Sequence, residues 1–215
     1  MALLQVALDT DDISFALRLA SILSSELDKD KLLMEAGTPL IKAWGTLSVK
    51  LLKEVTQTRV VADTKTMDVG GFESEIMFKA GADIVTVLGL ADDSTIEEAV
   101  KTARKYNGQV MVDLINCPDP VERAKEAIRL GADIILYHLG IDVQRKRGIT
   151  ASDMIDEIKR LSSLGARVAV AGGIKPGRAR QLVEAGAEIV IVGSAITKAD
   201  DPLSVAKLLL EEISI

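Results

Sequence analysis

The sequence predicts a single (β/α)₈ barrel that takes up the whole chain, residues 1–215. Short runs rich in β-branched residues alternate with longer amphipathic stretches from end to end, and eight such pairs can be placed. A chain of 215 residues is long enough for one barrel. Because 48% of the residues are hydrophobic and only 3% aromatic, the core must consist of Ala, Val, Ile and Leu, the usual filling of a barrel.

The expected strands follow one another along the chain, and a segment with helical periodicity comes after each of them. In order, they cover residues 3–8, 32–35, 60–63, 84–88, 110–114, 134–137, 167–171 and 189–192. An open doubly wound sheet is the competing architecture. However, the first turn, Asp9 to Asp12, lacks the Gly-x-Gly-x-x-Gly pattern that receives a dinucleotide. No linker-like or low-complexity segment indicates a second domain.

An internal sequence repeat, called the echo below, supports this alternation of elements. Residues 79–85, 130–135 and 184–190 share one pattern, in which Gly-Ala and an acidic residue precede an apolar β-branched run. A glycine after the last helical turn takes the left-handed cap conformation. The apolar run that follows is typical of a barrel strand buried on both faces. Each copy therefore predicts the end of a helix and the start of a strand.

Charge and cysteine content exclude several classes of function. The formal net charge is −6, without a basic patch, so we do not expect nucleic acid as a partner. Cys117 is the only cysteine, which excludes an intrachain disulfide and a cysteine zinc cluster and favours a buried small side chain. No apolar run approaches a membrane span, and residues 1–5 do not resemble a signal peptide. We therefore expect a cytoplasmic protein that does not bind membranes.

Polar residues gather where the expected strands end, and in such a barrel the active site lies at these carboxyl ends. They are Asp9, Glu35, Asp63, Lys65, Asp68, Asp113 and His138. We expect all of them to face one mouth. Carboxylates brought together near low-dielectric walls repel one another unless a cation joins them. Mg²⁺ held by some of Glu35, Asp63 and Asp113 is the natural resolution.

The alternative interpretation of these acids is that they cap the helices that follow, where a negative charge favours the helix N-terminus. This explains any one acid taken alone better than it explains the whole ring. Asp11 and Asp12 fit it well, because they precede the apolar stretch that begins at Ile13. We assign these two residues no chemistry.

His138 is the only histidine, and it follows an apolar run at the predicted top of the barrel. A single histidine is often only a packing residue. Its position beside the acid ring nevertheless favours a role in moving a proton, because an imidazole exchanges protons near neutral pH.

Two glycine-containing turns follow the seventh and eighth expected strands. They contain Gly172 with Gly173, and Gly193 with Ser194. Barrels commonly build a phosphate site at these two strands from backbone N–H groups. Tight turn geometry alone would explain one glycine but explains two adjacent pockets less well. We therefore expect a phosphorylated ligand.

The motif Asp63-Thr64-Lys65-Thr66-Met67-Asp68, directly after the third expected strand, resembles the Asp-x-Lys-x-x-Asp signature of the orotidine monophosphate decarboxylase superfamily. The resemblance extends over essentially the whole chain. Within that superfamily, four segments are most similar to the 3-hexulose-6-phosphate synthase family, namely residues 35–39, 63–70, 137–144 and 193–197.

The resemblance implies a homodimer that joins formaldehyde to D-ribulose 5-phosphate in an aldol reaction, giving D-arabino-hex-3-ulose 6-phosphate, and that catalyses the reverse cleavage. It also implies Mg²⁺ as the cofactor, with Mn²⁺ as the alternative. By the family pattern, Glu35 and Asp63 bind the metal, and Asp113 is a further active-site acid. Asp68 would reach across the dimer interface into the neighbouring site.

This reaction begins with the weakly acidic hydrogen on C1 of ribulose 5-phosphate. Its removal requires a base, and positive charge must stabilise the resulting enediolate. We expect His138 to be the base, and the metal and Lys65 to supply the charge. The enediolate carbon then attacks formaldehyde, and His138 or a bound water protonates the new alkoxide.

Three other functions compete. A 3-keto-L-gulonate 6-phosphate decarboxylase would share the metal ligands and the enediolate, but its family carries arginines where this chain has Ile141 and Ser194, which argues against a carboxylated substrate. Orotidine monophosphate decarboxylase itself would have Ile-Pro after Asp68, where this chain has Val69-Gly70. A non-catalytic sugar-phosphate-binding barrel is the third, and the acid, lysine and histidine set argues against it.

Overall fold

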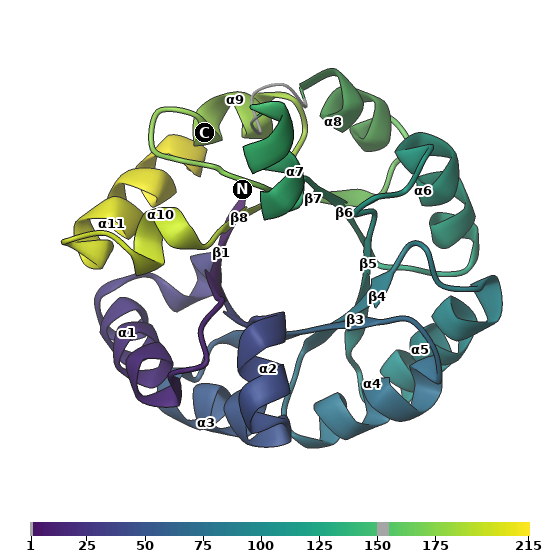
Figure 1. The fold of residues 1–215 in the computed structure, drawn as a ribbon, viewed down its shortest axis with the longest axis horizontal. Helices are drawn as coiled ribbons and strands as arrows, with labels where there is room; N and C mark the ends of the chain where they lie inside the picture. Colours follow the sequence, from purple (N-terminus) through teal and green to yellow (C-terminus); the bar gives the residue numbers. More distant parts are fainter. Residues whose placement is uncertain (1, 150–154) are drawn as a thin grey trace.

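A closed barrel of parallel strands forms the centre of the computed structural model, which describes residues 2–149 and 155–215 (Figure 1). Each strand pairs with the next in sequence, and β8 pairs with β1 to close the barrel. The strands are β1 (Leu3–Leu8), β2 (Leu32–Ala36), β3 (Arg59–Thr66), β4 (Ile84–Leu88), β5 (Gln109–Asp113), β6 (Ile134–His138), β7 (Arg167–Ala171) and β8 (Ile189–Val192). The predicted fold class is confirmed.

The predicted strand bounds agree closely with the structure. β1, β4, β7 and β8 begin and end where the sequence predicts. β2 and β6 end one residue later than predicted, and β5 begins and ends one residue earlier. β3 differs most, because it continues through residues 64–66. In this extension, the register of β3 against β4 shifts between Ala62 and Thr66.

Helices surround the barrel as an outer ring in Figure 1. They are α1 (Ile13–Glu26), the 3-10 helix η1 (Lys29–Lys31), α2 (Thr38–Trp44), α3 (Thr46–Thr56), α4 (Gly70–Lys79), α5 (Asp93–Lys105), α6 (Pro120–Arg129), α7 (Ile141–Arg147), α8 (Ile155–Ser162), α9 (Ala179–Glu184), α10 (Ser194–Thr197) and α11 (Pro202–Ile213). α2 and α7 lie nearer the barrel axis than the outer helices in this view. Both contribute residues to the central cavity described below.

The core has two parts because each strand buries both of its faces. The larger apolar cluster lies between the strands and the helices. The smaller cluster fills the barrel itself and comes from alternate strand positions: Ala7, Leu33, Val61, Ile84, Met111, Ile134, Leu136, Ala169, Ala171, Ile189 and Ile191. A period of two places successive side chains on opposite faces, which explains the alternation. The barrel interior is therefore packed at its lower and middle levels rather than hollow.

The inward-facing positions become polar toward the carboxyl ends of the strands. Two residues after an apolar barrel-filling residue comes a polar one: Glu35 after Leu33, Asp63 after Val61, Thr86 after Ile84, Asp113 after Met111, and His138 after Leu136. Five strands thus direct polar groups into the same end of the barrel. The strand period and the barrel closure together create the site.

The three copies of the echo have the same structure, in which a helix ends at a glycine and a strand follows. Gly81, Gly131 and Gly186 have φ of 103°, 95° and 107°, and each donates its N–H to a carbonyl of the preceding helix end. These left-handed glycines end α4, α6 and α9 in the same way. The predicted meaning of the echo is confirmed.

The acidic residue of the echo has a structural role in two of its copies. The Asp83 carboxylate accepts the N–H of Val60 at 2.7 Å and pairs with Lys53. The Asp133 carboxylate accepts the N–H of Val110 at 2.8 Å and pairs with Arg104. These aspartates bind the start of the preceding strand at the amino-terminal face of the barrel. These two carboxylates therefore have a structural role and not a catalytic one.

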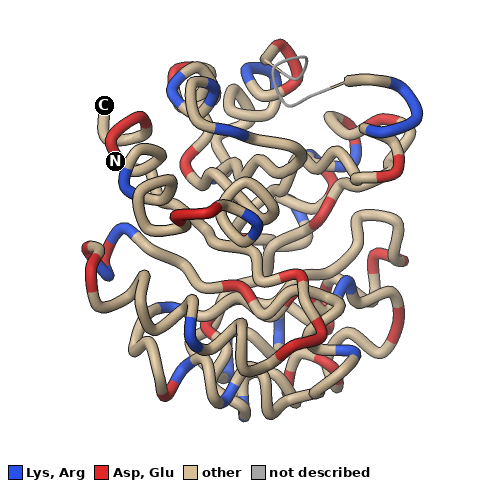
Figure 2. Tube along the Cα trace, turned by 60° about the vertical axis from the view of Figure 1, so that its left-hand side comes forward, with Lys and Arg blue, Asp and Glu red and all other residues tan. Residues whose placement is uncertain are grey.

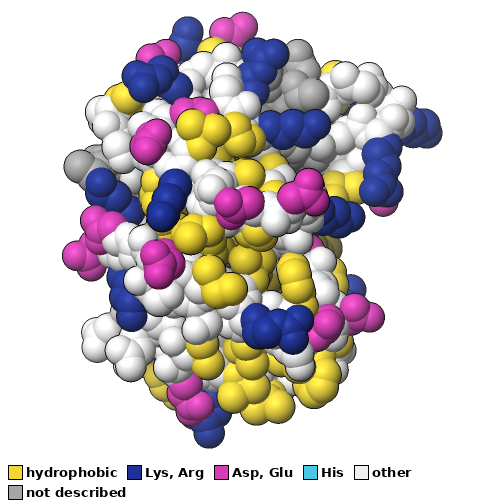
Figure 3. Space-filling view, turned by 90° about the vertical axis from the view of Figure 1, so that its left-hand side faces the viewer, with side chains coloured by type: hydrophobic (Ala, Val, Ile, Leu, Met, Phe, Trp, Pro, Cys, Tyr) yellow, Lys and Arg dark blue, Asp and Glu magenta, His cyan; other side chains and the backbone are white. Residues whose placement is uncertain are grey.

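The outer surface mixes charges of both signs. Figure 2 shows Lys and Arg positions interspersed with Asp and Glu along the chain. The face seen in Figure 3 has hydrophobic side chains between charged ones. Ile22 of α1 and Leu208 of α11 are among the exposed apolar residues of the described chain. None of the helices formed by residues 2–149 and 155–215 has the length and apolar composition needed to cross a bilayer.

Candidate active site

A cavity of about 510 Å³ opens at the carboxyl-end mouth of the barrel. Nine of the predicted site residues line it: Asp9, Glu35, Asp63, Lys65, His138, Gly172, Gly173, Gly193 and Ser194. Asp113 has no exposed surface and contacts this group from the β5 side. The sequence prediction of a polar mouth at the strand ends therefore agrees with the structure for these ten residues.

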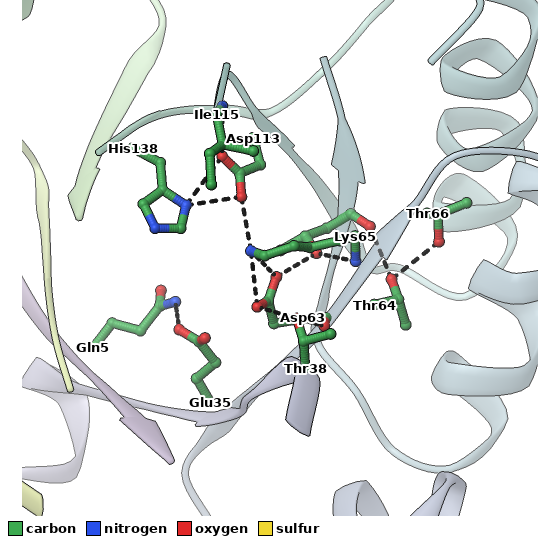
Figure 4. Close-up of polar contacts among 11 residues, drawn as sticks. Gln5, Glu35, Thr38, Asp63, Thr64, Lys65, Thr66, Asp113, Ile115 and His138 are labelled. Atoms are coloured by element: carbon green, nitrogen blue, oxygen red, sulfur yellow. Dashed lines mark hydrogen bonds and ion pairs between the residues drawn. The ribbon is translucent and has the colours of Figure 1, made fainter. Parts of the chain in front are cut away.

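Asp68 is the exception, and the expectation that it faces the same mouth is wrong. Its carboxylate is exposed and accepts the N–H of Val69 at 2.7 Å. It lines a separate cavity of about 320 Å³ between the N-terminal ends of α4 and α5. The extension of β3 and the turn after it carry Asp68 outward, whereas Asp63 and Lys65 point into the barrel (Figure 4).

Lys65 joins two buried carboxylates across the site. Its Nζ lies 3.0 Å from Asp63 Oδ2 and 2.9 Å from Asp113 Oδ2 (Figure 4). Burial alone would lower the pKa of Lys65, but the charges of Asp63 and Asp113 outweigh it and raise that pKa above its ordinary value. Lys65 is therefore a fixed cation and not a base at neutral pH.

His138 contacts the same aspartate from the opposite side. Its Nδ1 lies 3.0 Å from Asp113 Oδ2, and Asp113 Oδ1 accepts the N–H of Ile115 at 2.9 Å. Burial alone would raise the pKa of Asp113, but the hydrogen bond and charge of His138, together with Lys65, lower it to about 2. A carboxylate can only accept, so Nδ1 of His138 carries a proton in this contact, and in the neutral imidazole the lone pair is then on Nε2.

Glu35 and Asp9 form an acidic wall beside this group. Glu35 is buried, and its Oε2 accepts the amide of Gln5 at 2.5 Å. Burial and the nearby carboxylates of Asp63 and Asp9 raise the pKa of Glu35 well above its usual range. Burial and Asp63 also raise the pKa of Asp9, although the mouth of the cavity leaves its side chain open to solvent.

The donor set fits a hard divalent cation. Glu35 and Asp63 present carboxylate oxygens side by side with Asp9, and this mutual repulsion is what a cation would relieve. No group of three or more His, Cys, Asp or Glu suited to a metal occurs among the described residues. Mg²⁺, however, is usually held by only one or two carboxylates and completes its shell with water and substrate oxygens. Glu35 and Asp63 meet that requirement.

The glycine turns after β7 and β8 form the opposite wall of the cavity. Gly172 has a φ of 124°, and a β-carbon at this position would lie 2.6 Å from the carbonyl oxygen of Leu139. Only glycine fits such a position without moving the β6–α7 connection. The turn therefore brings bare backbone to the cavity.

Two minor predictions meet mixed outcomes. Asp12 is the N-cap of α1, where its side chain accepts the N–H of Phe15 at 3.0 Å, as predicted. Asp11 does not cap the helix, and its carbonyl accepts the indole N–H of Trp44 instead. Cys117 is half-buried at the edge of the core rather than fully buried.

The sequence prediction missed several polar residues of the cavity. They are Gln5, Thr38, Thr86, Asp142 and Gln144. Gln5 and Thr86 interrupt otherwise apolar strands, and that was the available signal. Thr38 donates to Asp63 Oδ2 at 2.7 Å, and Gln144 donates to the Leu139 carbonyl at 2.7 Å. Gln5, Thr38 and Thr86 thus hydrogen-bond the predicted Glu35 or Asp63, whereas Gln144 contacts the β6–α7 connection.

The fold and this site define a class of barrel enzymes, and comparison with known proteins identifies it. The chain matches the Orotidine 5'-phosphate decarboxylase / HUMPS family over residues 2–209, and it belongs to this family. The resemblance stated from the Asp-x-Lys-x-x-Asp motif is thereby confirmed.

Within the family, the chain is similar to 3-hexulose-6-phosphate synthases. It is 42% identical to that of Mycobacterium gastri over 98% of this chain and 99% of the relative. A solved 3-hexulose-6-phosphate synthase superposes with a TM-score of 0.91 at 42% identity, covering 98% of this chain and 99% of that one. The 3-keto-L-gulonate-6-phosphate decarboxylase from Vibrio cholerae has a TM-score of 0.86 at 30% identity and covers 99% and 97%. Sequence identity, more than fold, separates the two.

Proposed function

We propose that this protein joins formaldehyde to D-ribulose 5-phosphate in a Mg²⁺-dependent aldol reaction, and that it catalyses the reverse cleavage. The observation that carries the proposal is the chain of contacts from His138 through Asp113 to Lys65, beside two buried carboxylates in one cavity. A base, a fixed cation and a pair of hard oxygen ligands are the groups that enediolate chemistry requires.

His138 acts as the base in this proposal. Asp113 accepts a hydrogen bond from Nδ1–H, and the Nε2 lone pair of the neutral imidazole removes the hydrogen from C1 of the sugar as a proton. Asp113 remains ionised, because its pKa is lowered to about 2, and so it stabilises the imidazolium that forms. After the new carbon–carbon bond has formed, the same imidazolium can return its proton to the alkoxide derived from formaldehyde.

Lys65 stabilises negative charge on the substrate oxygens. Asp63 and Asp113 hold its ammonium group in place from two sides, so little reorganisation is needed when charge develops. Glu35 and Asp63 would hold Mg²⁺. When bound, the cation supplies Lewis-acid stabilisation of the enediolate oxygens. Mn²⁺ suits the same oxygen ligands.

The two ends of the cavity fit the two substrates. We assign the phosphate to Gly172, Gly173, Gly193 and Ser194, because Lys65 is the only lysine or arginine among the described cavity residues and is already paired. Backbone donors must then take the anion. The similar Vibrio cholerae decarboxylase is named for a sugar phosphate, which supports a substrate of this class in the barrel. The apolar side chains of Ile115 and Ile141 line the cavity and suit small, uncharged formaldehyde.

A homodimer is part of the proposal, with Asp68 directed to the neighbouring site. Asp68 lies beside three exposed apolar residues, Met67, Val69 and Phe72, whose exposed fractions are 53%, 56% and 66%. Adjacent large apolar residues at this level of exposure are typical of an interaction surface. The separate cavity at Asp68 continues this surface onto α5. A second copy of the chain would cover it.

The fold similarity to the Vibrio cholerae enzyme favours one alternative, decarboxylation of 3-keto-L-gulonate 6-phosphate. The cavity argues against a carboxylated substrate, because Ile141 and Ser194 line it where a cation would be needed. A non-catalytic sugar-phosphate sensor is the other alternative. It gives no reason for a histidine oriented by a buried aspartate.

Formaldehyde consumption by purified protein with ribulose 5-phosphate and Mg²⁺ tests the proposal. We expect rapid consumption by the wild type and by Glu184→Gln, an exposed carboxylate-to-amide control on α9. We expect loss in Asp63→Asn, in His138→Ala and after EDTA treatment. A wild type that consumes no formaldehyde but releases carbon dioxide from the gulonate phosphate would support the decarboxylase. Full activity in His138→Ala would refute the base assignment.

A further inference from the structure

Thr86 of β4 contacts three consecutive residues of the Asp-x-Lys motif. Its hydroxyl donates to Asp63 Oδ1 at 2.8 Å and accepts the backbone N–H of Lys65 at 3.0 Å. Its carbonyl accepts the hydroxyl of Thr64 at 2.8 Å. The direction of the two hydroxyl bonds is fixed, because a carboxylate only accepts and a backbone N–H only donates.

The backbone that Thr86 contacts is in an uncommon conformation. Lys65 has a φ of 47°, in the left-handed region that side chains with a β-carbon rarely adopt. The register shift of β3 against β4 falls between Ala62 and Thr66, so Lys65 lies within it. Such a conformation is unfavourable and persists only where the surroundings enforce it. The bond from Lys65 N–H to Thr86 is one such enforcement.

Packing alone does not explain a threonine at this position. The other residues of β4 are apolar, and Thr86 is buried with 1% of its surface exposed. Valine has nearly the same shape and would fill the same space without a polar atom. The hydroxyl is therefore accounted for by its two hydrogen bonds.

We propose that Thr86 is a positioning residue, which holds the Asp63 carboxylate and the Lys65 main chain in the geometry that brings Lys65 Nζ between Asp63 and Asp113. The proposal rests on the proposed function, since it assigns Thr86 to the same site. Asp63 and Lys65 converge in Figure 4, and Thr86 links them through one oxygen atom. Thr86 acts through these residues and not on the substrate.

Thr86→Val and Thr86→Ser separate positioning from packing. The serine variant keeps the hydroxyl, and the valine variant keeps the shape. We expect kcat to fall about 10–100-fold in Thr86→Val, the range typical of an outer partner of a ligating group, and to stay within about threefold in Thr86→Ser. KM for ribulose 5-phosphate should change little in either variant, because the glycine turns are not altered. Thr102→Val, a buried threonine of α5 outside the cavity, is the matched control.

Hydrogen exchange of the Lys65 amide, measured by NMR, gives a readout that does not depend on turnover. We expect faster exchange in Thr86→Val, and wild-type protection in Thr86→Ser and in Thr102→Val. Wild-type kcat in Thr86→Val, or an equal loss in Thr86→Ser, would overturn the proposal. If the wild type consumes no formaldehyde, the proposed function fails and the exchange data alone decide the role of Thr86. Unchanged Lys65 protection in Thr86→Val would then overturn that role.

Discussion

Replacing Asp113 with asparagine tests the central contacts of the site. Asp113 is fully buried, and its carboxylate lies between Lys65 Nζ and His138 Nδ1 at 2.9 Å and 3.0 Å. Asparagine keeps the size of the side chain but removes its charge. It also offers an N–H group toward His138, which would favour the tautomer that protonates Nε2. The base would then be lost, and we expect kcat to fall by about 100-fold or more.

The stability effect can be worked out from the pKa of Asp113. Its value in the fold is about 2, against an ordinary value of 3.8. Each unit corresponds to about 1.4 kcal/mol, so the ionised carboxylate contributes about 2 kcal/mol to the free energy of unfolding at neutral pH. Because the pKa of Asp113 is lowered in the fold, this contribution is complete at pH values above the pKa of the unfolded chain. It falls to about 1 kcal/mol by pH 3 and disappears as the pH passes below 2.

Urea unfolding of wild type and Asp113→Asn between pH 3 and pH 7 measures this difference. We expect the difference in free energy of unfolding between the two proteins to fall by about half from pH 7 to pH 3. At pH 7 it corresponds to a fall in melting temperature of roughly 4–8 °C for a chain of this size. The double variant with Lys65→Met should be destabilised by less than the sum of the single variants, because the two residues contact each other. A gap that does not depend on pH, with kcat unchanged, would refute the reasoning.

Three further predictions follow from the site and its surroundings. Glu35→Gln should stabilise the metal-free protein at pH values above the ordinary pKa of a glutamate. Burial and neighbouring acids raise the pKa of Glu35 in the fold, so its negative charge is disfavoured there. Melting temperatures from pH 4 to pH 8 should show a gain that grows with pH, and a loss at every pH would contradict this. Phe72→Glu should dissociate the proposed dimer in sedimentation velocity, since it places a charge on an exposed apolar surface, and a persistent dimer would exclude that interface. Gly172→Ala should raise KM for ribulose 5-phosphate by about tenfold or more, because the new methyl group would meet the Leu139 carbonyl. Initial-rate kinetics measure it, and an unaltered KM would remove this turn from the phosphate site.

Much of the fold could be predicted because its signals are local. A glycine such as Gly81 ends a helix by its own backbone preference, and the apolar run after it must be buried on both faces. The bounds of β3 were the least accurate, because its last residues are held by bonds to Thr86 across the register shift. Such a bond depends on a neighbouring strand that pattern and period do not reveal.

The site residues also fall into those that local sequence signals predict and those that depend on contacts in the fold. Asp63, Lys65 and His138 could be predicted because each follows an apolar strand and carries a side chain with obvious chemistry. Gln5 and Thr86 were missed, since a neutral polar residue inside a strand usually has no catalytic meaning and its importance comes from its partner. Asp68 was expected at the same mouth, but the geometry of the turn after β3 decides where it points.

Transfer of the formaldehyde carbon tests the central claim most directly. Wild-type protein is incubated with ¹³C-formaldehyde, ribulose 5-phosphate and Mg²⁺, and the products are followed by ¹³C NMR. The account predicts that the label appears in the terminal hydroxymethyl carbon of a hexulose 6-phosphate, and that His138→Ala abolishes this signal. Label that remains entirely in formaldehyde, while the wild type is folded and binds ribulose 5-phosphate, would contradict it.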